Sequence, residues 1–171
     1  MIKKFIIAAI LFSATAFNVN AQRYAIIDTK YILDKLPEYK AAQDKLNAFS
    51  EQWQQEIDKK SGDLDKMYKQ YDAEQVMLSD ELKKKREDEL FNKEKELKDL
   101  QKKRYGYEGD IFKKRQELIK PIQDKVYNAI QRLAVAKSYD FILDKSEGIT
   151  VIFADPKLDK SDDVLRELGV K

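Results

Sequence analysis

The sequence contains no cysteine and no histidine in its 171 residues, and only five glycines and three prolines. Without cysteine the chain forms no disulfide, thiolate metal site or thiolate nucleophile. Without histidine it lacks the commonest metal ligand and the usual general base near neutral pH. Carboxylates are common, but they do not cluster at a catalytic spacing, and no GxxxxGKS or GxxxxGKT phosphate loop is present. We therefore predict no enzyme, no metal site and no cofactor.

Long apolar runs are also scarce, and the one candidate lies at the N-terminus. Lys3 and Lys4 precede a short apolar run at 5–12, and Val19-Asn20-Ala21 offers small residues for cleavage. The run is too short to hold the chain across a bilayer. We therefore predict that residues 1–21 are a cleaved export signal; an uncleaved membrane anchor is the alternative.

The mature chain is predicted to have no net charge. Removing Lys3 and Lys4 leaves 31 basic residues against 31 acidic ones. This balance argues against nucleic acid as a partner, because such binding depends on excess positive charge. Charged residues make up 37% of the chain, which is typical of long solvated helices.

The two ends of the chain carry β-strand patterns. A first strand is predicted at Arg23–Asp28, and its terminal aspartate can cap a short helix at Thr29–Leu36. Near the C-terminus we predict a β-hairpin that joins strands Tyr139–Asp144 and Ile149–Ala154. A last short helix is predicted at Val164–Leu168.

The long middle stretch, Glu38–Ala136, has the spacing of helices. Its apolar residues recur at steps of three and four, which is close to coiled-coil spacing; the outgoing set is Ala42, Leu46, Phe49, Trp53, Ile57, Leu64, Tyr68, Tyr71 and Leu78. Ser79 and Asp80 are the best candidates for a turn and a new helix cap. Residues 38–80 carry a net charge of −4 and residues 81–120 carry +4. We therefore predict two antiparallel legs that attract each other.

Four positions in this stretch are hinge candidates: Gly62, Gly106, Gly109 and Pro121. A helical glycine is less stable than alanine by about 1 kcal/mol. Two glycines three residues apart therefore weaken the return leg at one place. They serve either as a flexing point or as a site of close packing between the legs, and the sequence leaves both open.

The chain therefore divides into an export signal (1–21), a β-rich oligomerisation body (22–37 and 125–171) and a helical arm (38–124). The body is small, and its strands are apolar on both faces. A second copy of the same chain is the simplest cover for such a sheet, so we expect a homo-oligomer. The predicted interface residues are Tyr24, Ala25, Ile26, Ile27, Phe141, Ile142, Leu143, Val151 and Phe153.

The order of these elements resembles the Skp/OmpH family of periplasmic chaperones. The residues that carry the likeness are Tyr24–Asp28, Tyr139–Asp144 and Asp162–Leu168. The resemblance implies an α+β fold with a small β-rich trimerisation body and a long antiparallel α-helical hairpin, a coiled-coil tentacle. Three chains would form a jellyfish-like homotrimer in the periplasm. The family holds unfolded outer-membrane β-barrel proteins between its arms without ATP and prevents their aggregation.

The neutral charge departs from the strongly basic members of that family. We therefore carry over no lipopolysaccharide site, and we expect at most transient contact with a membrane surface. The basic runs on the return leg, such as Lys102-Lys103-Arg104 and Lys113-Lys114-Arg115, form either local positive patches or solvated helix faces.

Aromatic and methionine side chains between the charges suit weak, promiscuous contacts with clients. The predicted client-binding residues on the arm are Trp53, Met67, Met77, Phe91, Tyr105 and Phe112. By spacing, Tyr68, Tyr71 and Tyr107 fall on the seam between the legs. The alternative function is an exported coiled-coil structural or tethering protein of the cell envelope, because charged heptads serve that purpose equally well.

Overall fold

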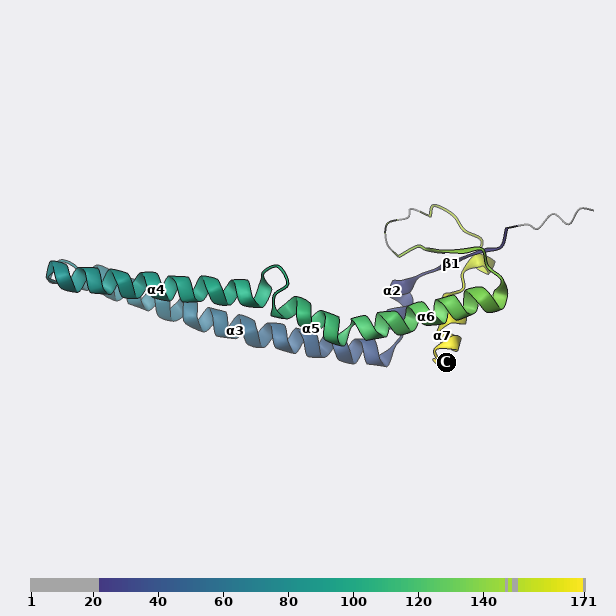
Figure 1. The fold of residues 1–171 in the computed structure, drawn as a ribbon, viewed down its shortest axis with the longest axis horizontal. Helices are drawn as coiled ribbons and strands as arrows, with labels where there is room; N and C mark the ends of the chain where they lie inside the picture. Colours follow the sequence, from purple (N-terminus) through teal and green to yellow (C-terminus); the bar gives the residue numbers. More distant parts are fainter. Residues whose placement is uncertain (1–21, 147, 149–150, 171) are drawn as a thin grey trace, which may run out of the picture.

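The computed structural model describes residues 22–146, 148 and 151–170. The predicted export signal, residues 1–21, lies outside the described residues. The molecule is elongated: a long helical arm extends from a small body that contains both strands and the C-terminal helix (Figure 1). Among the described residues, no helix combines the length and the apolar character needed to cross a membrane.

Helix α3 (Pro37–Glu74) forms the outgoing leg of the arm, as its apolar spacing predicted. Pro37 lies in the first turn, where its missing N–H removes no hydrogen bond within the helix. With 38 residues at about 1.5 Å each, α3 is roughly 57 Å long. Gly62 lies inside the helix and does not interrupt it. The buried side chains of α3 are Ala42, Leu46, Trp53, Ile57 and Leu64.

The return leg consists of three helices: α4 (Asp80–Tyr105), α5 (Asp110–Leu118) and α6 (Lys120–Lys137). Helices α4 and α5 pack along α3, while α6 continues into the body. The predicted cap is confirmed, because the Ser79 hydroxyl accepts a hydrogen bond from the N–H of Leu82 at the start of α4.

Three of the four hinge candidates lie at the two interruptions of the return leg. Gly106 and Gly109 border the loop between α4 and α5, and Pro121 lies in the first turn of α6. A Cβ on Gly106 would lie 2.3 Å from the carbonyl oxygen of Lys102, and one on Gly109 would lie 2.9 Å from that of Lys103. The glycines therefore allow the backbone of the loop to lie close to the last turn of α4, and the close approach is not between the legs.

Alanine substitutions at Gly62 and at Gly106 should change the free energy of unfolding in opposite directions. A Cβ on Gly62 would have no atom within 4 Å, so Gly62→Ala should raise the free energy of unfolding by about 0.5–1 kcal/mol. Gly106→Ala should lower it by about 1–3 kcal/mol, because the loop must shift to relieve the overlap. Urea unfolding followed by circular dichroism measures both. Equal changes at the two positions would show that Gly106 is not required for the close approach of the loop backbone.

Strands β1 (Tyr24–Ile27) and β2 (Phe141–Asp144) form a two-stranded parallel sheet. Tyr24 pairs with Phe141 and Ile27 with Asp144. Parallel neighbours need a crossover connection, and here the whole arm lies within that connection. The body thus brings together segments from both ends of the chain.

The predicted C-terminal β-hairpin is wrong in its described part. Residues 151–154 of the expected third strand are not in strand conformation, and residues 149 and 150 lie outside the described residues. β2 pairs instead with β1, and the N–H of Lys145 donates to the carbonyl of Ile27 at 2.8 Å. Alternating β-branched residues favour an extended chain, but a strand also needs a backbone partner, and the local pattern does not identify that partner.

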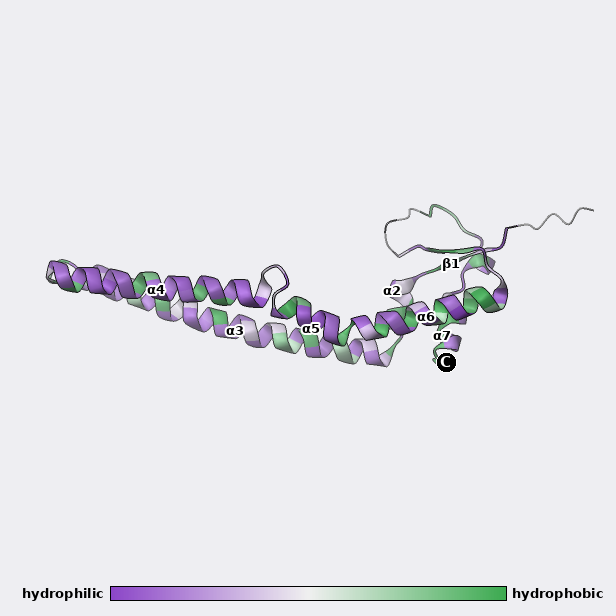
Figure 2. Cartoon of the chain, viewed as in Figure 1, coloured by the Kyte–Doolittle hydropathy of each residue, from purple (hydrophilic) through white to green (hydrophobic). Residues whose placement is uncertain are grey.

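The core of the body lies where α2 (Thr29–Asp34), α6 and α7 (Ser161–Glu167) meet β1. A short 3-10 helix, η1 (Pro156–Leu158), precedes α7. The buried members of the core are Ile27, Ile32, Leu36, Val126, Ala129, Leu133, Val164 and Leu165. Hydrophobic residues are denser in α6 and the body than along α4, which is mostly hydrophilic (Figure 2). Burial is therefore concentrated at the base of the arm.

Candidate functional site

An arginine lies in the seam between the two legs, close to the first break in the return leg. The guanidinium of Arg104 is 2.9 Å from the Glu56 carboxylate on α3 and 2.6 Å from the Asp110 carboxylate on α5. It also lies over the ring of Trp53, 5.0 Å from the centroid, and Trp53 stacks on Phe49. The Arg104 side chain is 20% exposed, so these interactions are less screened than those of a surface ion pair. Arg104 thus connects α3, α4 and α5.

The residues predicted to bind clients fall into two groups. Trp53 is buried in the seam and Met67 is half-buried on α3. The exposed members, with exposed fractions of 79%, 66%, 38% and 46%, are Met77, Phe91, Tyr105 and Phe112. The hydroxyl of Tyr105 donates to the carbonyl of Ser50 at 2.8 Å, which holds its ring against α3. Only the exposed group is open to a partner without separation of the legs.

Of the three tyrosines predicted on the seam, two join the legs. The hydroxyl of Tyr71 donates to Glu87 at 2.5 Å and that of Tyr68 donates to Glu94 at 3.4 Å. The prediction for Tyr107 is wrong, because this side chain is 96% exposed in the loop between α4 and α5. Heptad spacing assumes a continuous helix, and the loop removes Tyr107 from that pattern.

The predicted interface residues of the body also divide by exposure. Ala25, Ile26 and Ile27 are buried within the chain's own core. Tyr24 and Phe141 are exposed and stack on each other across the sheet, with ring centroids 5.6 Å apart. Ile142, Leu143 and Val151 are half-buried, and Phe153 is 85% exposed. Tyr24, Phe141 and Phe153 are therefore the interface candidates most accessible to another chain.

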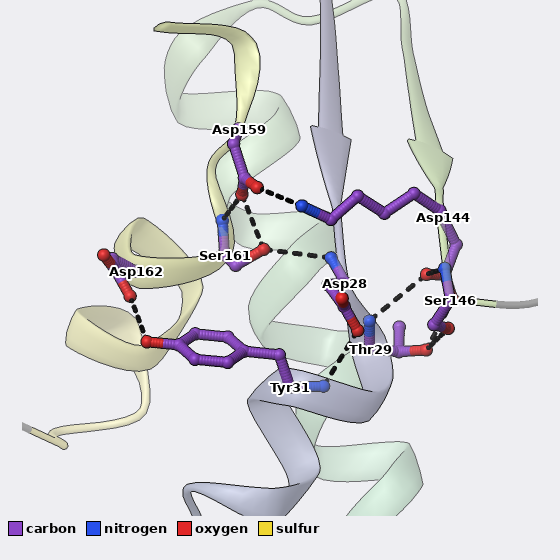
Figure 3. A network of polar contacts seen from close by, with 9 residues as sticks. Asp28, Thr29, Tyr31, Asp144, Ser146, Asp159, Ser161 and Asp162 are labelled. Atoms are coloured by element: carbon purple, nitrogen blue, oxygen red, sulfur yellow. Dashed lines mark hydrogen bonds and ion pairs between the residues drawn. The ribbon is translucent and has the colours of Figure 1, made fainter. Parts of the chain in front are cut away.

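A polar network joins the ends of β1 and β2 to the start of α7 (Figure 3). The Thr29 hydroxyl and its backbone N–H both donate to Asp144. The buried Ser161 hydroxyl accepts from the N–H of Asp28 at 2.9 Å, and Ser161 itself donates to Asp159. Within the described residues, no three acidic side chains are arranged to hold a metal ion. The network instead fixes α2 and α7 against the sheet.

The match to a family model decides the family of this chain. The model for outer membrane proteins of the OmpH-like type matches residues 23–168, which include the body and the whole arm. The chain belongs to the OmpH-like family. The resemblance inferred from the body segments is therefore confirmed.

A solved structure agrees with this assignment at the level of the fold. The crystal structure of a candidate outer membrane chaperone (OmpH-like) from Caulobacter crescentus matches with a TM-score of 0.68 and 18% sequence identity. The match covers 86% of this chain and 84% of the other. The search of curated proteins found no match.

Sequence reasoning missed two residues of this OmpH-like arm. Arg104 belongs to a basic run that reads as a solvated face, yet it lies seven residues after Leu97 and seven before Ile111, at a seam position. Tyr107 lies between Gly106 and Gly109, and two glycines so close together indicate a loop and not a helical seam.

The polar network predicts how the stability of this OmpH-like body depends on pH. Burial raises the pKa of Asp144, but hydrogen bonds from Thr29 and Ser146 outweigh it and hold that pKa below its usual value. Burial likewise opposes the interactions of Asp159 with Lys145 and Ser161, which lower its pKa. Folded-state pKa values below the unfolded value of about 3.9 stabilise the fold above that pH, and this contribution is lost as the pH falls through the folded pKa.

We therefore expect the melting temperature to fall below about pH 4. Asp144→Asn should be less stable than the parent at neutral pH, and the difference should shrink as the pH falls, because the parent carboxylate then becomes protonated. Thermal unfolding from about pH 6 to pH 3 measures this. A constant difference across that range would show that the charge of Asp144 contributes nothing.

Proposed function

We propose that this chain is an ATP-independent periplasmic holdase. It binds unfolded outer-membrane β-barrel proteins between helical arms and prevents their aggregation. Membership of the OmpH-like family and the fold shared with a candidate outer membrane chaperone support this proposal. No catalytic step is required, because holding a client needs only many weak, exchangeable contacts.

The observation that carries the proposal is the set of exposed apolar side chains along a charged arm. They lie at separate places on α3, α4 and α5, in the loop between α4 and α5, and at the arm tip; they are Tyr68, Val76, Met77, Leu82, Phe91, Tyr105, Tyr107 and Phe112. The charged residues between them keep the arm solvated. Such isolated contacts suit a partner without fixed structure, and several arms acting together raise the effective concentration.

We further propose that three copies associate through their bodies. Within the described residues β2 pairs with β1 alone, so its second edge is available to another chain. Ile152 and Phe153, which follow β2 in the sequence, are 95% and 85% exposed, and their burial would stabilise such an interface. The arms would then project from one shared base and enclose a cavity.

Light scattering of residues 22–171 with and without an unfolded β-barrel protein tests the proposal. We expect the mass of a trimer alone, and a soluble complex of fixed stoichiometry when urea-unfolded client is diluted into it. Light scattering of the diluted client should also stay low. A chain that leaves the client to aggregate would support the alternative, an exported structural or tethering protein.

The contribution of the trimer is tested by Phe153→Asp. A carboxylate at this position would oppose burial in an interface, so we expect a folded monomer. The monomer should protect the client poorly, because its single arm encloses no cavity. Val76→Asp at the arm tip, also an exposed apolar residue, should remain trimeric. Equal protection by a folded monomer would overturn the cavity mechanism.

A further inference from the structure

The loop between α4 and α5, residues 106–109, projects from the arm on the side away from α3 (Figure 1). Its side chain Tyr107 is 96% exposed and is not part of the seam. An aromatic ring held in water along a stiff arm needs an explanation, because a continuous helix would have been the simpler way to build the return leg.

The pairing of the legs shows that this loop is extra chain. From Glu74 opposite Arg86 to Glu56 opposite Arg104, each leg advances by 18 residues. On the body side, from Phe49 opposite Lys114 to Glu38 opposite Lys125, each leg advances by 11 residues. Between these two stretches the outgoing leg advances by 7 residues and the return leg by 10. The surplus residues are excluded from the seam as the loop.

The loop is closed and held at its base. The N–H of Gly109 donates to the carbonyl of Gly106 at 2.9 Å. Arg104 and Asp110 form an ion pair of 2.6 Å across the base, and Glu56 fastens Arg104 to the other leg. Glu108 adopts a φ of 51°, in the left-handed region that non-glycine residues rarely occupy. The loop is restricted because its two ends are joined to each other and Arg104 at its base is bound to α3. Tyr107 is therefore presented in a limited set of orientations.

The exposed charges around the loop are mostly basic, although Glu108 in the loop itself is an exposed carboxylate. Lys102 and Lys103 precede it and Lys113 and Arg115 follow it; all four are exposed and form no ion pair within the described part of the chain. The carboxylate of Asp110 is engaged by Arg104. An approaching partner therefore meets an aromatic ring beside the exposed carboxylate of Glu108, with four free positive charges on the two flanking helices.

We propose that the loop displays Tyr107 as an anchor for extended, unfolded polypeptide in which aromatic side chains alternate with carboxylates. This inference rests on the proposed holdase function: Tyr107 is one contact point for the client, and clients that carry both aromatic and acidic side chains are preferred there. Tyrosine offers a large amphipathic surface with few rotatable bonds, and a restrained loop reduces the entropy lost on binding. The surrounding lysines select clients by charge as well as by aromatic content.

Tyr107→Ala tests the anchor, with Tyr127→Ala as a matched control on α6, where Tyr127 is 60% exposed. Affinity for a urea-unfolded β-barrel protein should fall about fivefold for Tyr107→Ala, stay near the parent value for Tyr107→Phe, and change less than about twofold for Tyr127→Ala. Circular dichroism should be unchanged in all three. Parent-like affinity of Tyr107→Ala, or equal losses at the two tyrosines, would overturn the anchor.

Two peptides of equal length test the charge preference. One alternates Phe with Asp and the other alternates Phe with Lys. The Phe–Asp peptide should bind more tightly, and a photocrosslinking amino acid at position 107 should capture it. Equal binding of the two peptides would overturn the preference. If the parent fails to bind unfolded β-barrel protein at all, the holdase proposal fails as well, whereas loss of the Tyr107 effect alone leaves it standing.

Discussion

Ile32→Ala should lower the free energy of unfolding by about 2–5 kcal/mol. Ile32 is fully buried in α2, at the centre of the core formed by β1, α6 and α7. Removing its side chain atoms loses their burial and leaves a cavity, because neighbours such as Val164 and Ala129 are themselves fully enclosed and cannot collapse far. The body is small, so a loss of this size is a large share of its stability.

Urea unfolding at a fixed protein concentration measures the effect, since an oligomer would make stability depend on concentration. Val76→Ala at the arm tip is the control: it is 85% exposed, so its stability should stay within about 0.5 kcal/mol of the parent. If the two substitutions had similar effects, the body would not owe its stability to this core. A second readout is the melting temperature, which should fall for Ile32→Ala alone.

The elements with long, regular patterns were predictable from the sequence. The spacing of Ala42, Leu46, Trp53 and Ile57 fixes one face of α3, and all four are buried. The caps were predictable because they depend on one side chain and the next turn: Asp28 accepts from the N–H of Tyr31 at 2.9 Å. The family resemblance was also visible in the sequence, because the short body segments that carry it include β1, β2 and the residue that caps α2.

The features that depend on partners distant in sequence were not predictable. Residues 151–154 carry a strand pattern, but β2 pairs with β1 from the other end of the chain. The seam position of Arg104 depends on Glu56 and Asp110 being opposite it, and composition alone does not show this. The exposure of Tyr107 depends on a mismatch in register between the legs, which becomes visible only when both are in place.

The burial of Trp53 changes the expected role of that residue. The sequence predicted that Trp53 contacts clients, but the residue lies in the seam and is only 8% exposed. Its ring stacks on Phe49, with centroids 5.7 Å apart, and supports the guanidinium of Arg104. A buried aromatic contributes through its area and through the ion pairs that it shields from water. We therefore expect Trp53 to act mainly on the stability of the arm.

Trp53→Ala should destabilise the arm by about 3–5 kcal/mol, the range typical of a buried tryptophan. Amide hydrogen exchange should accelerate in the middle of α3 and at the end of α4, because Arg104 loses the ring beneath it. Phe91→Ala is the control, since Phe91 is 66% exposed on α4 and its loss should leave exchange unchanged. Trp53 is the only tryptophan, so its emission in the parent also reports seam burial directly. If Trp53→Ala weakened client binding but left stability and hydrogen exchange at their parent values, Trp53 would be a client contact after all.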